Sequence, residues 1–156
     1  MHELSLRRRM AGYEPAAWAL IPDLGLYMDQ VITYIEQQLK PLYGEAAKNL
    51  LTPAMINNYV KSGLLHRPQG KKYNREHLAL LMMIVTLKPV ASMDDILKLI
   101  TPPEGQSIEQ LYEDFCSVQK AAFQAVALET AASALQYTVT ATAYQLIAED
   151  ALTASE

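Results

Sequence analysis

The segment LALLMMIVTL at 78–87 constrains the fold of this chain more than any other feature. Nine of its ten residues are apolar, so a helix formed here has no side suited to water. Asn74 is a good helix cap shortly before it, and Pro89 cannot continue the helix after it. A helix that is apolar on all sides has to be buried. The sequence therefore predicts a central core helix at 75–88, with the rest of the chain packed around it.

Helices on either side of this segment are predicted from caps and apolar spacing. Apolar residues at three- and four-residue intervals predict a helix at 28–40, which Pro41 ends. Ser92 caps the short segment MDDILKLI, which ends before two prolines. The first 25 residues mix glycine, proline and scattered apolar residues without a period, so we predict an irregular segment at 1–25.

The C-terminal region, from Ser107 onward, contains no glycine or proline. Ser107 and Gln110 form a capping box, which predicts the start of a helix. A single helix over 107–156 would be long and would need a partner, as in a coiled coil. A phase shift in the apolar spacing and the sequence ETAAS at 129–133 favour a break into two helices, or a kink.

A short helix is predicted at 53–62, because both of its ends carry strong signals. Thr52 is an N-cap, Pro53 suits the first helical position, and Gly63 suits the turn just after the end. At 100° per residue the helix has two distinct faces. The apolar face is formed by Met55, Ile56, Tyr59 and Val60, and the opposite face by Ala54, Asn57, Asn58 and Lys61.

Charge is distributed unevenly along the chain. The formal net charge of −4 taken alone argues against a nucleic-acid partner. Residues 46–88, however, carry seven basic residues against one acidic residue. Residues 101–156 carry one basic residue against eight acidic ones. The sequence thus predicts a basic module followed by an acidic helical region.

The segment HRPQGKKY at 66–73 contains two turn residues between short extended pieces, which predicts a small β-hairpin or wing. Asparagine can bond both edges of an adenine, and lysine can reach guanine or a phosphate. A polar helix face followed by a basic hairpin is the arrangement with which winged helix-turn-helix proteins bind DNA. The candidate DNA-binding residues are Asn57 and Asn58 for the bases, Lys61 for either a base or a phosphate, and Arg67, Lys71, Lys72, Tyr73 and Arg75 for the DNA backbone. The alternative is a solvated surface on which the asparagines bond the local backbone.

Catalysis finds little support in the sequence. The three histidines have no partners at the spacing of a metal site or a catalytic triad, and no phosphate-binding glycine loop is present. The single cysteine, Cys116, lies on an apolar helical stripe and suits a reducing cytoplasm. No run of apolar residues approaches the length of a membrane span. We expect a soluble, cytoplasmic protein that is not an enzyme and holds no cofactor or metal.

Three segments, LTPAMINNYVKSGLL, KKYNREHLALL and LKPVASMDDILKLI, resemble an uncharacterised bacterial domain family related to the MerR-type winged helix-turn-helix regulators. In MerR-type proteins a tyrosine near the end of the recognition helix precedes Gly-Leu and a hairpin, as Tyr59, Gly63 and Leu64 do here. Tyr73 matches the aromatic residue that closes the hairpin. The matches to the short helix that follows are Ser92, Ile96 and Leu99. The resemblance covers about residues 24–100.

This resemblance implies a mainly helical winged helix-turn-helix fold with a β-hairpin wing. It also implies a DNA-binding transcriptional regulator that forms a homodimer through its C-terminal helices, and it implies no ligand. Two residues depart from the MerR pattern, since Asn57 and Lys71 stand where those proteins have arginines. Lys71 keeps the charge but loses the two-pronged geometry of a guanidinium, and Asn57 loses the charge.

The predicted organisation is an irregular N-terminal segment (1–25), a winged helix-turn-helix domain (26–100) and an acidic helical region for dimerisation (101–156). The main rival function is a protein-interaction or assembly module that keeps the fold without reading DNA. In that case the acidic region could cover the basic face of its own or another subunit. A ligand-binding sensor is a third alternative, and its pocket would be lined by Tyr112, Phe115, Phe123 and Tyr137.

Overall fold

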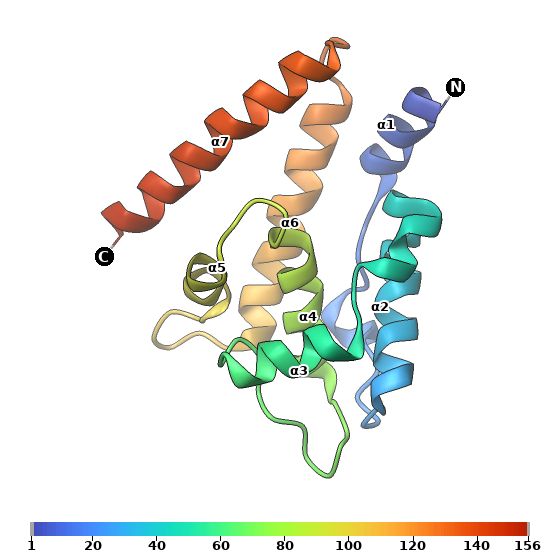
Figure 1. Cartoon of the computed structure of the whole chain (residues 1–156), viewed down its shortest axis with the longest axis vertical. Helices are drawn as coiled ribbons and strands as arrows, with labels where there is room; N and C mark the ends of the chain where they lie inside the picture. Colours follow the sequence, from blue (N-terminus) through green and yellow to red (C-terminus); the bar gives the residue numbers. More distant parts are fainter. Residues whose placement is uncertain (1, 156) are drawn as a thin grey trace.

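The computed structural model describes residues 2–155, and its secondary-structure elements are all helices, which confirms the all-α prediction (Figure 1). The α-helices are α1 (His2–Gly12), α2 (Met28–Tyr43), α3 (Pro53–Lys61), α4 (Arg75–Leu87), α5 (Met93–Ile100), α6 (Ile108–Ala127) and α7 (Ala134–Ala154). Two short 3-10 helices, η1 (Trp18–Leu20) and η2 (Gly44–Asn49), lie between the first three.

Helix α4 is the centre of the fold, as its apolar sequence predicts. Every residue from His77 to Val85 is buried, and α2, α5 and α6 pack around it. Asn74 caps α4 by accepting a hydrogen bond from the backbone N–H of His77. Tyr112 of α6 lies in the same core and donates to the carbonyl of Ala16, 2.7 Å away. The core therefore draws on residues on both sides of the 26–100 segment.

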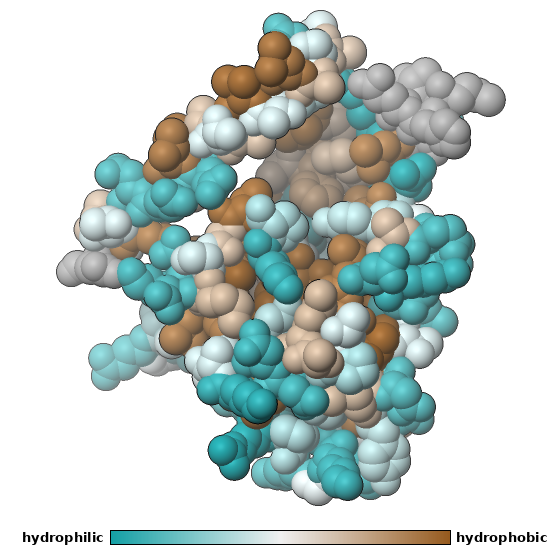
Figure 2. Space-filling model, in the orientation of Figure 1, coloured by the Kyte–Doolittle hydropathy of each residue, from teal (hydrophilic) through white to brown (hydrophobic). Residues whose placement is uncertain are grey.

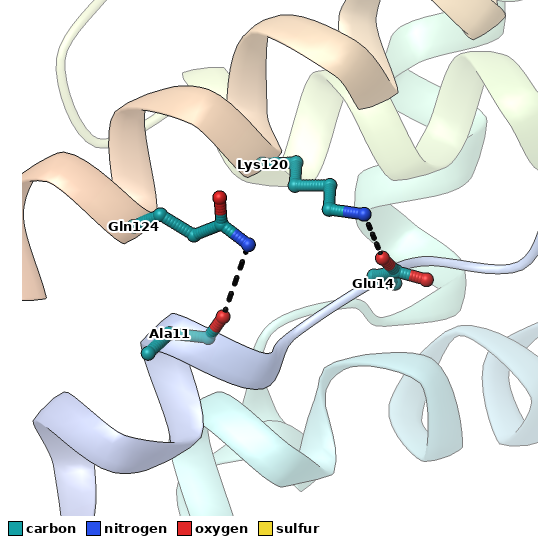
Figure 3. A network of polar contacts seen from close by, with 4 residues as sticks. All are labelled: Ala11, Glu14, Lys120 and Gln124. Atoms are coloured by element: carbon teal, nitrogen blue, oxygen red, sulfur yellow. Dashed lines mark hydrogen bonds and ion pairs between the residues drawn. The ribbon is translucent and has the colours of Figure 1, made fainter.

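The prediction of an irregular segment at 1–25 is wrong for its first half, because α1 occupies His2–Gly12. The sequence of this helix has no apolar stripe that would predict it. In the structure the helix packs along α6. Gln124 of α6 bonds the carbonyl of Ala11, and Lys120 forms an ion pair with Glu14 just after the helix (Figure 3). These contacts come from residues more than 100 positions away, so a local pattern could not predict them.

Helix α2 also differs from its predicted end, since it continues past Pro41 to Tyr43. A proline within the last turn removes only one backbone hydrogen bond, and its fixed φ angle is compatible with a helix. Gly44 then ends the helix with a positive φ of 58° and a backbone bond to Lys40. The proline is thus tolerated close to a helix end that glycine determines.

The C-terminal region forms two helices, which decides between the alternatives left open by the sequence. Helix α6 ends at Ala127, and α7 begins after Ser133, whose side chain accepts from the backbone N–H of Gln136. Helix α7 leans away from the body of the protein (Figure 1), contacts α5, and contains no buried residue. Most of its surface therefore faces solvent in a single chain.

The predicted β-hairpin wing is not confirmed. Residues 66–73, called the 66–73 loop below, reverse direction at Gly70 and Lys71, which both have positive φ angles. Only one bridge, between Gln69 and Lys72, joins the two sides of this turn. A second isolated bridge joins Tyr73 to Leu26, and no sheet is present between residues 2 and 155.

We expect the burial around α4 to dominate stability, and two leucines allow a matched test. Leu81 is 0% exposed in α4, whereas Leu24 is 86% exposed before α2. Leu81→Ala should lower the free energy of unfolding by about 2–5 kcal/mol, because it removes buried methylene groups and leaves a cavity. Leu24→Ala should change it by less than about 0.5 kcal/mol. Urea denaturation followed by circular dichroism measures both, and equal losses would contradict the central position of α4.

Candidate nucleic-acid interface

Helix α3 is fixed by its caps and by one buried face, as its sequence predicts. The Thr52 hydroxyl accepts from the backbone N–H of Met55 at 3.2 Å, and Pro53 takes the first position. Ile56 and Tyr59 are 0% and 1% exposed and lie in the core. Gly63, with a φ of 84°, then turns the chain away. The helix can therefore present only one orientation to solvent.

The outward face of α3 carries three exposed polar side chains: Asn57, Asn58 and Lys61. Within the part of the chain that the structure describes, the amides of Asn57 and Asn58 make no hydrogen bond to other protein groups. This observation argues against asparagines kept only for local backbone bonds. Both amides are available to an external partner.

The 66–73 loop places three more basic side chains in solvent: Arg67, Lys71 and Lys72. The Lys72 ammonium lies 5.6 Å from the centre of the Tyr27 ring, a cation–π contact with the residue just before α2. Figure 1 shows α3 and this loop at one end of the molecule, away from α7. Hydrophilic side chains cover much of that end in Figure 2.

A groove of about 470 Å³ connects these elements. Pro53 at the start of α3 and Lys71 of the loop line it, together with residues of the first turns of α2. The remaining lining residues are Tyr27, Met28, Asp29 and Ile32. The structure thus brings together the first turn of α3 and the 66–73 loop, which the sequence assigned to one surface.

Two of the predicted DNA-backbone contacts are corrected by the structure. Tyr73 is 4% exposed, pairs with Leu26 through two backbone hydrogen bonds of 2.8 Å, and has a pKa raised by burial. It belongs to the core and cannot reach a phosphate. Arg75 is half-buried: its Nε donates to the carbonyl of Ile21 at 3.0 Å, and its guanidinium lies over Trp18. Its contacts are thus within the protein.

The structure also adds a cation that the sequence reading did not assign. Lys88, just after α4, is exposed, and its Nζ donates to the hydroxyl of Tyr59 in α3 at 3.1 Å. The Tyr59 side chain is buried beneath Lys88, so its hydroxyl bonds within the protein. In the sequence, Lys88 is indicated as part of a basic surface only by the excess of basic residues over 46–88.

Of the residues predicted to line a ligand pocket, Tyr112 and Phe115 are neighbours with ring centres 6.4 Å apart, whereas Phe123 packs near Tyr13. Tyr112 is buried in the core, whereas Tyr137 bonds Arg7 at the corner between α6 and α7. Cys116 is half-buried, and burial raises the pKa of its thiol. Among residues 2–155, no three metal-binding side chains are grouped together. None of the helices in this range combines the length and apolar content that crossing a lipid bilayer demands.

The fold and this surface define an all-helical domain with a short polar helix and a basic loop exposed side by side. Residues 16–115 match the sequence profile of the family described as Domain of unknown function (DUF1836), and the chain belongs to that family. No curated protein and no solved structure matches the chain. The matched range extends from η1 into α6, and so includes Tyr112 and its contact at Ala16.

The two arginines near the loop should differ in their effect on stability. Arg75→Ala should lower the free energy of unfolding by about 1–3 kcal/mol, because it removes a charged hydrogen bond and a cation–π contact. Arg67→Ala should change it by less than about 0.5 kcal/mol, because Arg67 is exposed. Denaturation midpoints of the two variants measure the difference. Similar losses of stability in the two variants would contradict a stabilising role for the contacts of Arg75 within the protein.

Proposed function

We propose that this chain is a DNA-binding transcriptional regulator in which α3 enters the major groove and the 66–73 loop contacts phosphates. The observation that carries the proposal is the pair of exposed amides of Asn57 and Asn58 beside a basic loop, which bond no other group among residues 2–155. The order of elements from α2 to α5 supports an arrangement of the winged helix-turn-helix kind, similar to that of MerR-type regulators.

The dimensions of α3 support reading in the major groove. An α-helix with its side chains is about 10–12 Å across, which fits a major groove about 12 Å wide. Asn57 and Asn58 would bond base edges, for which adenine presents the matching donor and acceptor. Lys61 at the end of α3 would bond guanine or a phosphate. Ala54 on the same face is small enough to allow close approach of the helix.

Phosphate contacts would come from Arg67, Lys71 and Lys72, with Lys88 as an additional cation. Only one of the four is an arginine, so most of these contacts would lack two-pronged guanidinium geometry. We therefore expect the affinity to depend strongly on charge and salt, with sequence selectivity concentrated in α3. Distortion of the DNA is not part of the proposal.

The proposed regulator is a homodimer joined through its C-terminal helices. Helix α7 carries no charged residue before Glu149, and its large apolar residues are exposed (Figure 2). The most exposed are Leu135, Val139, Tyr144, Leu146 and Ile147. A helix with apolar side chains on all sides is normally covered by other protein. A second copy of α7 would bring no charge repulsion over this region.

The alternative function is a protein-interaction or assembly module that keeps the fold without reading DNA. The exposed apolar surface of α7 favours this alternative as well, because it would suit a different protein partner. Covering of the basic surface by the C-terminal region of the same chain is not supported, since α3 faces solvent with α7 present. Selection from a random duplex library by the purified full chain separates the two functions. An enriched palindrome supports a dimeric regulator, and no enriched sequence supports the alternative.

Lys72→Ala should reduce the salt dependence of DNA binding. Loss of one phosphate contact should lower the slope of log K against log salt by about one. Lys120→Ala is the matched control, because Lys120 lies on α6, paired with Glu14 beside α1 (Figure 3). Fluorescence anisotropy over a range of salt concentrations measures both slopes. An unchanged slope for Lys72→Ala would remove the loop from the interface.

Shortening the chain after Leu128 should abolish dimerisation and leave the domain folded. The deletion removes α7, which contains no buried residue, and leaves α6 with Tyr112 in place. Multi-angle light scattering should give twice the mass of one chain for the full protein and a single mass for the shortened protein. A dimeric shortened chain, or a monomeric full chain, would contradict dimerisation through α7.

A further inference from the structure

One buried polar side chain lies between the core and the proposed interface. His77 is 4% exposed and stands at the third position of α4. It completes a capping box, since its Nδ1 accepts a hydrogen bond from the backbone N–H of Asn74 at 2.9 Å. The same position belongs to glutamine in three other helices, where Gln30, Gln110 and Gln136 accept from the cap residue at the same distance. Histidine at this position in α4 therefore needs a separate explanation.

The imidazole makes a second contact that a capping box does not need. Its Nε2 lies 3.1 Å from the carbonyl oxygen of His66. The 66–73 loop begins at His66 and is followed directly by Asn74. A single ring in α4 thus bonds the backbone at the beginning of the loop and just after its end. Tyr73 packs edge-on against the same ring, with centroids 5.2 Å apart.

The two backbone contacts together specify the protonation state of His77. A carbonyl oxygen accepts, so Nε2 must carry a hydrogen, and a backbone N–H donates, so Nδ1 must not. This is the neutral Nε2–H form. The Asn74 Oδ1 lies 2.8 Å from Nδ1 and would accept a proton placed there. Protonation would therefore replace the bond from the Asn74 backbone by one to its side chain, and would release that backbone N–H.

We propose that His77 is the positioning residue of the 66–73 loop, and that it holds both ends of the loop only as the neutral imidazole. The charged ring would keep the Nε2–H bond to His66 but would lose the bond from the Asn74 backbone N–H. The contact of Arg67, Lys71 and Lys72 with an anionic partner would then weaken in acid. The last step rests on the proposed DNA-binding function, whereas the attachment of the loop to α4 does not.

The groups around the ring determine the pH range of the effect. Burial is the main influence and lowers the pKa of His77 below 6.5, and the nearby His66 ring lowers it further. Backbone groups of His66 and Arg67 and the charge of Glu76 act in the opposite direction. Beside the start of α4, Asp23 accepts from the backbone N–H of Arg75. Because the folded pKa is depressed, the stabilisation is complete above about pH 6.5 and is lost as pH falls through the folded pKa.

Hydrogen exchange on the full chain, without DNA, tests this role. Protection factors are compared at about pH 7.5 and about pH 5, corrected for the intrinsic pH dependence of exchange. Protection of the Asn74 and Lys72 amides should fall about fivefold in acid, as expected for the loss of one hydrogen bond. His77→Gln should remove this pH dependence, because the glutamine amide can accept from Asn74 at any pH in this range, as in the three other helices.

His66→Gln is the control for the neighbouring imidazole, and it should retain the loss of protection in acid. Unchanged protection of the wild-type loop at both pH values would overturn the proposal. So would a pH dependence that survives in His77→Gln and disappears in His66→Gln. DNA affinity measured on the same proteins should fall in acid for wild type and not for His77→Gln. If no DNA sequence binds, the proposed function fails while the exchange result still decides the role of His77.

Discussion

Burial of one helix, α4, determines the arrangement of the other elements. Nine consecutive residues of α4 are buried, so neighbouring helices must cover it on all sides. Helices α2, α5 and α6 pack directly against it, and α3 packs against α2 with Ile56 and Tyr59 buried in the core. Once this face of α3 is buried, its asparagines and Lys61 have to face solvent. The exposed polar surface is thus a consequence of how the core is covered, and it gains functional meaning from the basic loop beside it.

The helices that the sequence predicts are those whose signals lie within a few residues. Four predicted cap residues each accept a backbone N–H through a side-chain oxygen: Thr52, Asn74, Ser92 and Ser107. Helix α1 has no such signal, and its order depends on α6. For the same reason the sequence cannot separate exposed from buried residues in an aromatic and basic segment. Tyr73 and Arg75 read as surface residues beside Lys72, yet one pairs with Leu26 and the other bonds Ile21.

The sequence predicts the exposed residues of the proposed interface more completely than the contacts that hold the loop in place. Six of the eight predicted residues are exposed on α3 or the loop, whereas Tyr73 and Arg75 are not. The six exposed residues are Asn57, Asn58, Lys61, Arg67, Lys71 and Lys72. Periodicity identifies the outward face of a helix, because one turn repeats every 3.6 residues. The loop is held by contacts with Tyr27, just before α2, and with His77 in α4. Tyr27 precedes the loop in the sequence, and His77 follows it. Contacts of this kind follow from the packing of α2 and α4 and leave no local pattern.

Helix α7 makes few packing contacts within a single chain. It has 21 residues, a β-branched segment at 138–142 and little of its surface covered, whereas most of the stability of a helix in a protein comes from packing. In the proposed dimer the second copy supplies the missing contacts, so helix stability and dimerisation would be coupled. The base of α7 is fixed separately, because Arg7 of α1 bonds both the carbonyl of Glu129 and the hydroxyl of Tyr137. The N-terminal helix would then determine the angle of α7, and through it the distance between the two α3 helices on DNA.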